Sequence, residues 1–325
     1  MGAVEVNRQD QRTERWLGAL ASSVLVLILG MVVFVFSKAW PSFAHNGLSW
    51  FGDGPIDEQL TRIFNSPANP NDYLYAVGAW PLLYATALTT LAAVVLGAAF
   101  ALLCAVFIVE FAPSWLRRML EPVVRLLAAV PSVVCGLIGI LVLVPFVGDK
   151  LISEGRKESV AHVIQLDGSS ILVATVILTV MITPIMIAII VDGLRAVPRS
   201  WTEGAVALGV NRWRAIWTIG VRTARPAIIA AAVLATARAL GEAIMLSMVS
   251  GSVGFAPNPL DGITFIFEPA RPLAATIVDN AEGLSVKPFG QTMYAFAAIL
   301  LVSSMFLSLG GWAAKQPLRK YGIRA

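Results

Sequence analysis

Two charged residues stand four positions apart inside a long apolar stretch in the last third of the chain. Arg238 and Glu242 belong to the sequence Ala-Arg-Ala-Leu-Gly-Glu, within an apolar segment that runs from Pro226 to Ser250. Residues at i and i+4 share one face of an α-helix. A guanidinium is always protonated, and its planar fork matches the oxygens of a phosphate or a carboxylate. The pair therefore predicts a polar route for a negatively charged oxyanion.

A charge inside the hydrocarbon of a membrane is costly, so such residues face a helix-bundle interior or a pathway. Two interpretations of the pair remain open. In the first, Glu242 holds the guanidinium of Arg238 in a transport path and keeps the anion from binding too tightly to be released. In the second, Arg238 and Glu242 form a structural ion pair that holds helices together. Arg125 is different, because it follows Glu121 by four residues near the end of another apolar segment. We expect it to pair with Glu121 and to extend toward the headgroups.

The composition indicates that these charges lie in a membrane protein. Apolar residues make up 57% of the 325 residues and charged residues only 14%, whereas soluble domains carry about 25% charged residues. A bilayer core takes about 20 helical residues. Six apolar segments are long enough, at 16–37, 81–109, 123–147, 170–191, 226–250 and 290–314. We therefore expect an all-α, polytopic membrane protein with six transmembrane helices, the first being a retained helix rather than a cleaved signal.

The basic residues predict how these helices are oriented. If the N-terminus lies inside, the segments on that side carry 15 Lys and Arg residues, and those on the other side carry 7. Basic residues favour the cytoplasmic side, so both termini are expected there. The chain then divides into a cytoplasmic segment 1–15, a six-helix domain 16–314 and a cytoplasmic tail 315–325. The net charge of +4 reflects this orientation and gives no reason to expect a nucleic-acid partner.

A cytoplasmic hairpin is expected at 192–225, between the fourth and fifth apolar segments. Ser200-Trp-Thr-Glu203 has the form of a capping box, which predicts a helix start. Gly209 predicts the end of that helix, and Asn211 can cap a second one. The tryptophans of both helices are expected to be exposed. Docking on a cytoplasmic partner and lying on anionic lipid are both open interpretations, and docking explains the tryptophans better.

The hairpin resembles the EAA loop of ABC importer permeases. The matching residues are Glu203-Gly204-Ala205-x-x-x-Gly209, with Gly204 in place of the usual alanine and Arg222 in place of a usual proline. In that family the loop forms a coupling helix that fits a groove on the ATPase subunit. The resemblance therefore implies that Glu203, Gly204, Ala205 and Gly209 couple this chain to an ATPase.

Two further stretches are similar to the PstC-type permease of phosphate-specific importers. They are Leu127-Ala-Ala-Val-Pro-Ser-Val-Val-Cys-Gly136 and Ala237-Arg-Ala-Leu-Gly-Glu242. In that family the arginine and glutamate of the second stretch are the transport-critical charges, which here are Arg238 and Glu242. The resemblance covers roughly residues 16–314. It implies a type I ABC importer permease fold in a bacterial plasma (inner) membrane.

The same resemblance implies the partners of the chain. They are a PstA-type partner permease, two ATPase subunits and an extracytoplasmic phosphate-binding protein, with membrane lipid around the helices. The external segments 39–79 and 251–289 are long enough to be functional loops. Docking of the binding protein and plain interfacial anchoring by aromatic residues are both open for them.

The sequence also lacks the usual signs of catalysis. The motif G-x-x-x-x-G-K-[ST] does not occur, and no nucleophile–base pair or cluster of metal ligands stands out. We therefore expect a non-catalytic permease subunit with no cofactor of its own, and ATP and Mg²⁺ on the partner ATPase subunits. The expected function is ATP-driven import of inorganic phosphate. A permease for sulfate or molybdate, a stand-alone anion channel or secondary transporter, and a membrane-embedded scaffold remain alternatives.

Overall fold

The computed structural model describes residues 8–254 and 256–316 of the chain. Within these two ranges every regular element is helical, apart from one isolated parallel β-bridge. The all-α expectation is therefore confirmed. The first seven residues of the expected segment 1–15, and all but two residues of the expected tail 315–325, lie outside the described residues.

The described residues contain five helical segments that are long and apolar enough to cross a membrane, or six if one bent pair of helices is counted as a span. This agrees with the expected six transmembrane helices. The segments are Arg12–Phe51, Trp80–Phe111, Ser132–Leu151, Ile171–Arg195 and Phe289–Ala314, and the bent pair is Arg212–Val221 with Arg225–Leu240, at 67°.

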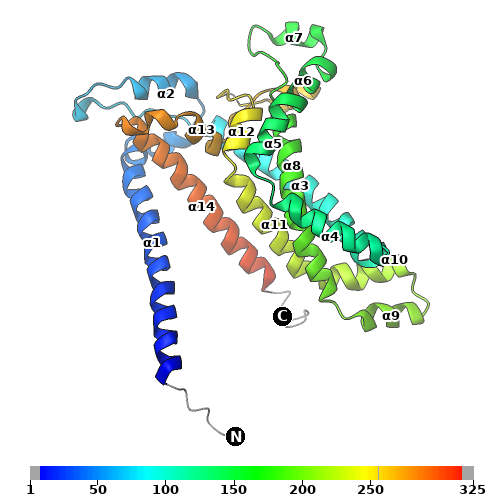
Figure 1. Ribbon diagram of the computed structural model, residues 1–325. Coiled ribbons are helices and arrows are strands. Elements are labelled where there is room, and N and C mark those ends of the chain that lie inside the picture. Colours follow the sequence, from blue (N-terminus) through cyan, green and yellow to red (C-terminus); the bar gives the residue numbers. More distant parts are fainter. Residues whose placement is uncertain (1–7, 255, 317–325) are drawn as a thin grey trace.

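Figure 1 labels the helices from which these spans are built. They are α1 (Arg8–Asn46), α3 (Trp80–Val106), α5 (Ser132–Ile138), α6 (Val144–Phe146), α8 (Ile171–Arg195), α11 (Arg225–Leu240) and α14 (Phe289–Lys315). Helix α10 (Arg212–Ala215) begins the bent pair and lies within the segment 192–225, which was expected to form the hairpin. The other helices are α2 (Ile56–Phe64), α4 (Ser114–Ala128), α7 (Glu154–Val160), α9 (Arg199–Ala207), α12 (Ile244–Val249) and α13 (Leu273–Asp279). Turns of π-helix extend α3, α6 and α10 and join α5 to α6.

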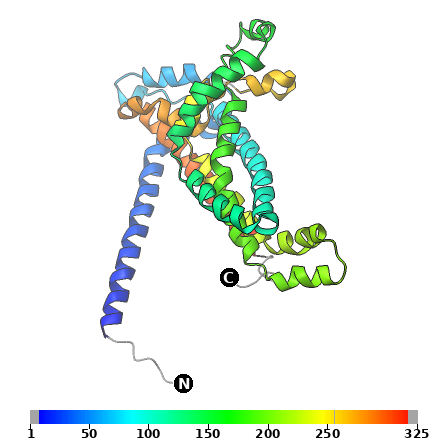
Figure 2. The ribbon, with the colours of Figure 1, turned by 45° about the vertical axis from the view of Figure 1, so that its right-hand side comes forward.

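The helices form a central bundle that a second pair joins through α14. Helices α3, α8 and α11 pack on one another, α1 packs against α14, and α14 in turn packs against α11. In Figures 1 and 2, α9 and α10 project at the end of the molecule where α1 begins and α14 ends. Helices α2, α7 and α13 lie at the opposite end (Figure 1). The two ends of the described chain and the hairpin therefore share one side of the molecule.

Small residues allow the central helices to approach closely. Ala231, Ala235 and Ala239 form the buried stripe of α11, the helix that packs on α8 and α3. On α3, an added Cβ at Gly97 would lie 3.2 Å from Oγ1 of Thr183 on α8. Membrane helices associate through such close packing, because lipid tails are as apolar as the side chains. The apolar pattern thus produces a tightly packed bundle around α8.

The third span begins later than the sequence indicates. The expected segment 123–147 is interrupted by Pro131, and the membrane-crossing helix runs from Ser132 to Leu151. Proline lacks a backbone N–H and disfavours helical conformation at the residue before it. The residues before this break belong to α4, a separate helix with none of its residues fully buried. The expected start of the third span at residue 123 was therefore wrong, because the span starts at Ser132.

This change also gives Glu121 a different partner. The expected ion pair between Glu121 and Arg125, both on α4, is absent from the described residues. Glu121 instead accepts two hydrogen bonds from Arg195 at the end of α8. Helix α4 packs along α8, so the guanidinium of Arg195 reaches both carboxylate oxygens. A bidentate pair between two helices fixes their relative position better than a pair within one helix could.

Candidate transport pathway and coupling hairpin

Arg238 lies near the end of α11, on a face that this chain leaves uncovered. The buried alanines of α11 belong to one core cluster with residues of α3 and α8, and α11 also packs against α14. Arg238 and Leu234, one turn before it, are exposed. Arg238 has no hydrogen bond or ion pair with another described residue. An arginine within a membrane span that points away from its own bundle requires a polar environment from another molecule or from a water-filled path.

Glu242 lies just beyond the helix, and here one expectation was wrong. The fifth span was expected to run unbroken from Pro226 to Ser250, with Glu242 one turn after Arg238 on the same face. The structure ends α11 at Leu240 and begins α12 at Ile244. Gly241 stands at the break, and glycine is among the least helix-favouring residues.

The break separates the environments of the two charges. Glu242 is only 9% exposed, whereas Arg238 is exposed. No ion pair within 4.0 Å joins them in the described chain. The structural ion pair considered from the sequence is therefore not formed. Glu242 lies in the non-helical backbone after α11, and Arg238 has no ion-pair partner among the described residues.

The two stretches that carry the resemblance lead into neighbouring helices. The first continues into α5 and the second precedes α12, and α5 packs on α12. Gly136 of α5 allows this contact, because an added Cβ would lie 2.8 Å from Sδ of Met248 and 3.2 Å from Cα of Met245. Each stretch contains a helix break, at Pro131 and at Gly241. Spans with broken helices are typical of membrane segments that line a cavity.

The hairpin forms as two short helices joined by a tight turn. Gly209 has a φ of +85°, and the N–H groups of Gly209 and Val210 donate to the carbonyls of Val206 and Ala205 at 2.9 and 3.1 Å. This Schellman arrangement closes α9. Oδ1 of Asn211 then accepts from the N–H of Trp213 at 2.8 Å, as expected for the cap of α10.

The expected capping box at the start of α9 is not formed. The helix begins at Arg199, one residue before Ser200, and Pro198 occupies the cap position without a side-chain hydrogen bond. The hydroxyl of Thr202 donates instead to the carbonyl of Arg199 at 2.9 Å. Proline fixes the extended backbone that precedes the helix, so the chain turns into α9 without a capping side chain. Glu203 is therefore free of a capping role.

The outer surface of the hairpin is exposed and partly apolar. Glu203, Gly204 and Gly209 are exposed, and Ala205 is half-buried. Leu208, next to the turn, is 88% exposed. Trp201, Val206 and Trp213 are exposed as well, and a cluster of exposed apolar side chains marks a surface that binds another protein or a membrane. The four residues expected to couple the chain to an ATPase thus lie together on this surface.

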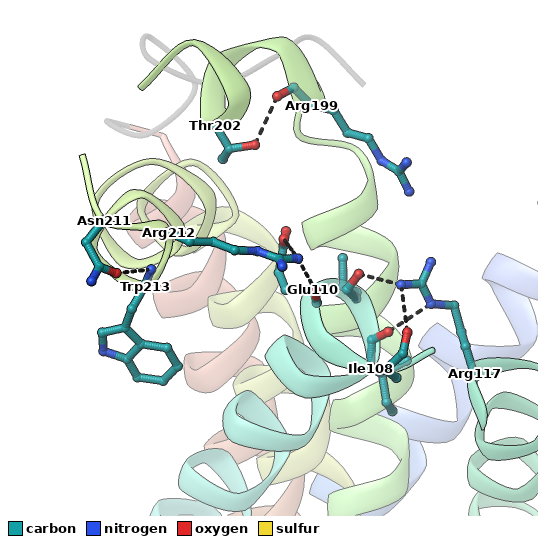
Figure 3. A network of polar contacts seen from close by, with 10 residues as sticks. Ile108, Glu110, Arg117, Arg199, Thr202, Asn211, Arg212 and Trp213 are labelled. Atoms are coloured by element: carbon teal, nitrogen blue, oxygen red, sulfur yellow. Dashed lines mark hydrogen bonds and ion pairs between the residues drawn. The ribbon is translucent and has the colours of Figure 1, made fainter. Parts of the chain in front are cut away.

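The other side of the hairpin is fixed to the end of α3 (Figure 3). Arg212 donates to the carbonyl of Glu110, and its guanidinium lies 3.9 Å from the Glu110 carboxylate. It also lies 5.3 Å from the ring of Phe111. Arg117 of α4 donates to the carbonyls of Ile108 and Val109 at 2.9 and 2.7 Å. Both arginines bind carbonyl oxygens that the end of the helix leaves without a partner. The contacts of Arg212 connect the hairpin to the second membrane-crossing segment, and those of Arg117 connect α4 to it.

A polar network at the opposite end of the molecule was not foreseen from the sequence. Arg271 is 8% exposed and forms an ion pair with Asp57 of α2, while Nη1 of Arg271 donates to the carbonyl of Ser252 at 3.2 Å. Burial raises the pKa of the nearby Glu268 carboxyl, and the charge of Asp261 adds to this shift. The backbone N–H of Asn258 opposes the shift.

The sequence could not relate the partners in these charged contacts. Arg271 and Asp57 are separated by 214 positions, so no local pattern relates them. Arg212 and Glu110 are likewise 102 positions apart. The only available signal was a charged residue between two prolines, Pro269-Ala-Arg-Pro272.

Comparisons with known proteins agree with this architecture. Residues 93–314 match the family described as "Binding-protein-dependent transport system inner membrane component". The chain is 31% identical over 309 residues to the probable ABC transporter permease protein YqgH of Bacillus subtilis, covering 93% of this chain and 91% of that protein. It is 30% identical over 318 residues to the phosphate transport system permease protein PstC 1 of Mycobacterium tuberculosis, covering 94% of this chain and 92% of that protein.

A solved structure supports the fold. A chain of a bacterial alginate ABC transporter, in complex with a periplasmic protein that holds an alginate pentasaccharide, superposes with a TM-score of 0.59 at 14% identity. The superposition covers 98% of this chain and all of that chain. The family match spans more than half of the residues and includes both the hairpin and the broken fifth span. The chain therefore belongs to the binding-protein-dependent transport system inner membrane components, as a non-catalytic, multi-pass subunit of an ABC transporter that works with an ATPase and a binding protein.

Proposed function

We propose that this chain is a transmembrane subunit of an ATP-driven importer of inorganic phosphate. An extracytoplasmic binding protein delivers the phosphate, and the chain provides part of the route across the plasma membrane. Relatives named as phosphate transport permeases, at about 30% identity, support this cargo. The single observation that carries the proposal is the unpaired Arg238 on the uncovered face of α11.

Arg238 and Glu242 are proposed to line the substrate pathway. The guanidinium of Arg238 presents several donors to phosphate oxygens. The buried carboxylate of Glu242 adds a negative charge near the path, which lowers the affinity for the anion. A transport path requires affinity that is high enough for binding and low enough for release. An anion channel that is not coupled to ATP would need the same intermediate affinity for the anion. Contact with an ATPase is therefore the feature that distinguishes an ATP-driven importer from a channel.

A second permease subunit, of PstA type, is proposed to cover the open face of α11. That arrangement would enclose Arg238 between the two subunits and away from lipid, which removes most of the cost of its charge. Two ATPase subunits would bind the coupling hairpins, with contacts from Glu203, Gly204, Ala205 and Gly209 on this chain. ATP and Mg²⁺ would then be held by those ATPase subunits, and this chain would hold no cofactor.

Both ends of the chain and the hairpin are proposed to lie in the cytoplasm. Cysteine introduced at Gly155 of α7 should react with an impermeant reagent from outside, and cysteine at Val210 only after permeabilisation. The two natural cysteines, Cys104 and Cys135, are free thiols and must first be replaced by alanine. Reaction of intact cells at position 210 but not at 155 would reverse the proposed orientation.

The proposed cargo can be tested on the isolated complex. Affinity purification of this chain should bring an ATPase subunit and, in the presence of cargo, a binding protein. That binding protein should retain labelled phosphate when washed with excess sulfate or molybdate. If the binding protein retained sulfate or molybdate in preference to phosphate, the proposed cargo would be wrong, but the proposed role as a permease would stand. Purification without any ATPase would favour a channel or a scaffold.

A further inference from the structure

A cavity of about 920 Å³ lies between the coupling hairpin and the ends of α3 and α8. Helix α9 forms one wall, and the start of α10 and the residues that follow α3 form another. Its charged lining residues are four arginines and two glutamates, namely Arg117, Arg195, Arg199, Arg212, Glu110 and Glu203. The positive charges therefore outnumber the negative ones along this partly open cavity.

Three of the four arginines are already held by the protein. Arg195 pairs with Glu121 outside this cavity, and Arg212 is close to Glu110. Arg117 uses Nε and Nη2 to bind carbonyl oxygens of the residues after α3. Its Nη1 makes no hydrogen bond within the described residues. One edge of a rigidly positioned guanidinium is therefore available to a ligand.

Arg199 is the unpaired member of the set. Its guanidinium makes no hydrogen bond or ion pair with any other described residue, although Glu203 stands one helical turn later. Helices stabilise such pairs less when the basic residue comes first. Figure 3 shows Arg199 extending from the start of α9 toward the side on which Arg117 lies, and Arg199, Arg117 and Arg212 all line the cavity. The free guanidinium thus projects into a cavity that already carries excess positive charge.

The surroundings of the cavity resemble a membrane interface. The rings of Phe111, Trp213 and Trp217 form a chain of contacts beside Arg212, with centroids 6.0 and 5.6 Å apart. Aromatic side chains of this kind concentrate at the level of lipid headgroups. Basic pockets among membrane helices on the cytoplasmic side bind anionic headgroups.

We propose that this cavity binds a phosphate group, with Arg199 and the free edge of Arg117 as its principal donors. Two guanidinium forks from different helices can share the oxygens of one phosphate. Such a ligand would connect the first residue of α9 to the end of α3 through α4. It would therefore stiffen the hairpin that transmits movement from the ATPase. The phosphate group belongs either to an anionic phospholipid or to inorganic phosphate from the cytoplasm, and this proposal does not depend on the transported cargo.

The lipid source is tested by native mass spectrometry of the purified complex. Phosphatidylglycerol and the zwitterionic phosphatidylcholine are added at equal concentrations, and the bound molecules are counted. Arg199→Gln is expected to reduce phosphatidylglycerol binding by roughly tenfold, the effect of losing one charge-assisted contact. Arg214→Gln is the matched control, because Arg214 is exposed on α10 and does not line the cavity. This control should bind phosphatidylglycerol as the unmodified complex does.

The free-phosphate source is tested on the same complex without its binding protein. Labelled inorganic phosphate is added in zwitterionic nanodiscs, in an Arg238→Gln background that removes the proposed pathway site. Binding that disappears with Arg199→Gln and persists with Arg214→Gln would assign the cavity to inorganic phosphate. Co-purification of the ATPase verifies that each variant has assembled. If neither probe distinguishes Arg199→Gln from Arg214→Gln, the cavity does not bind a phosphate group and the proposal is wrong.

Discussion

Uptake of the transported anion is expected to stop when Arg238 is replaced by glutamine, although the complex still assembles. Glutamine keeps much of the side-chain length and can still donate hydrogen bonds, but it removes the charge that attracts the anion. Losing one partner of an enclosed charged contact costs about 2–5 kcal/mol, which corresponds to a loss of affinity between roughly 30-fold and a few thousandfold. The measurement is initial uptake in proteoliposomes. Arg225→Gln, at the exposed start of the same helix, serves as the control and should retain uptake.

Two related substitutions separate the contribution of charge from that of shape. Arg238→Lys should restore uptake only in part, because an ammonium lacks the planar fork. Glu242→Gln should remove the opposing charge, so the anion should bind more firmly and leave more slowly. The charge-swapped double variant, Arg238→Glu with Glu242→Arg, should remain inactive even when it folds. Near-normal uptake by the swapped, assembled complex would contradict a role for Arg238 in the pathway.

Coupling to ATP hydrolysis is expected to fail when Gly209 is replaced by valine. Gly209 has a φ of +85°, and an added Cβ would meet no other atom within 4 Å. The penalty is therefore conformational rather than steric, at about 1–2 kcal/mol for an L-residue in the left-handed region. β-Branched valine tolerates this region poorly, so the turn after α9 should rearrange. Stimulation of the ATPase by loaded binding protein should fall strongly, while membrane insertion stays normal.

Gly209→Asn provides the control at the same position. Asparagine adopts the left-handed conformation more readily than other side chains, so it should keep most of the ATPase stimulation. Crosslinks from Asn211 to the ATPase should form in the unmodified complex and weaken in Gly209→Val. The docking hypothesis would be wrong if Gly209→Val kept full stimulation and Asn211 formed no crosslinks.

The fold class could be predicted because its signals are local and repeated. Long apolar segments specify membrane helices through their composition alone, and five or six spans are present in the described residues. The turn at Gly209 and the cap at Asn211 were also predicted, because each depends on a residue type at one position. Such elements need no information from elsewhere in the chain.

The helix breaks and the long-range pairs could not be predicted in the same way. The mean hydropathy of a membrane-length segment hardly changes with the three residues between Leu240 and Ile244. The fifth segment therefore looked continuous in the sequence. Arg195 rather than Arg125 binds Glu121, because packing of α4 on α8 decides the partner. The same holds for Arg271 and Asp57, whose contact depends on the position of α2. Where a charge finds its partner through tertiary packing, sequence spacing is a poor guide.

The most direct test of the proposed function is ATP-dependent uptake of labelled phosphate by proteoliposomes that contain the complete complex and its binding protein. The account predicts that phosphate accumulates only when ATP is supplied on the hairpin side. Excess unlabelled sulfate or molybdate should not compete, and Arg238→Gln should abolish the accumulation. Phosphate entry that proceeds without ATP, or preferential accumulation of labelled sulfate or molybdate, would contradict it.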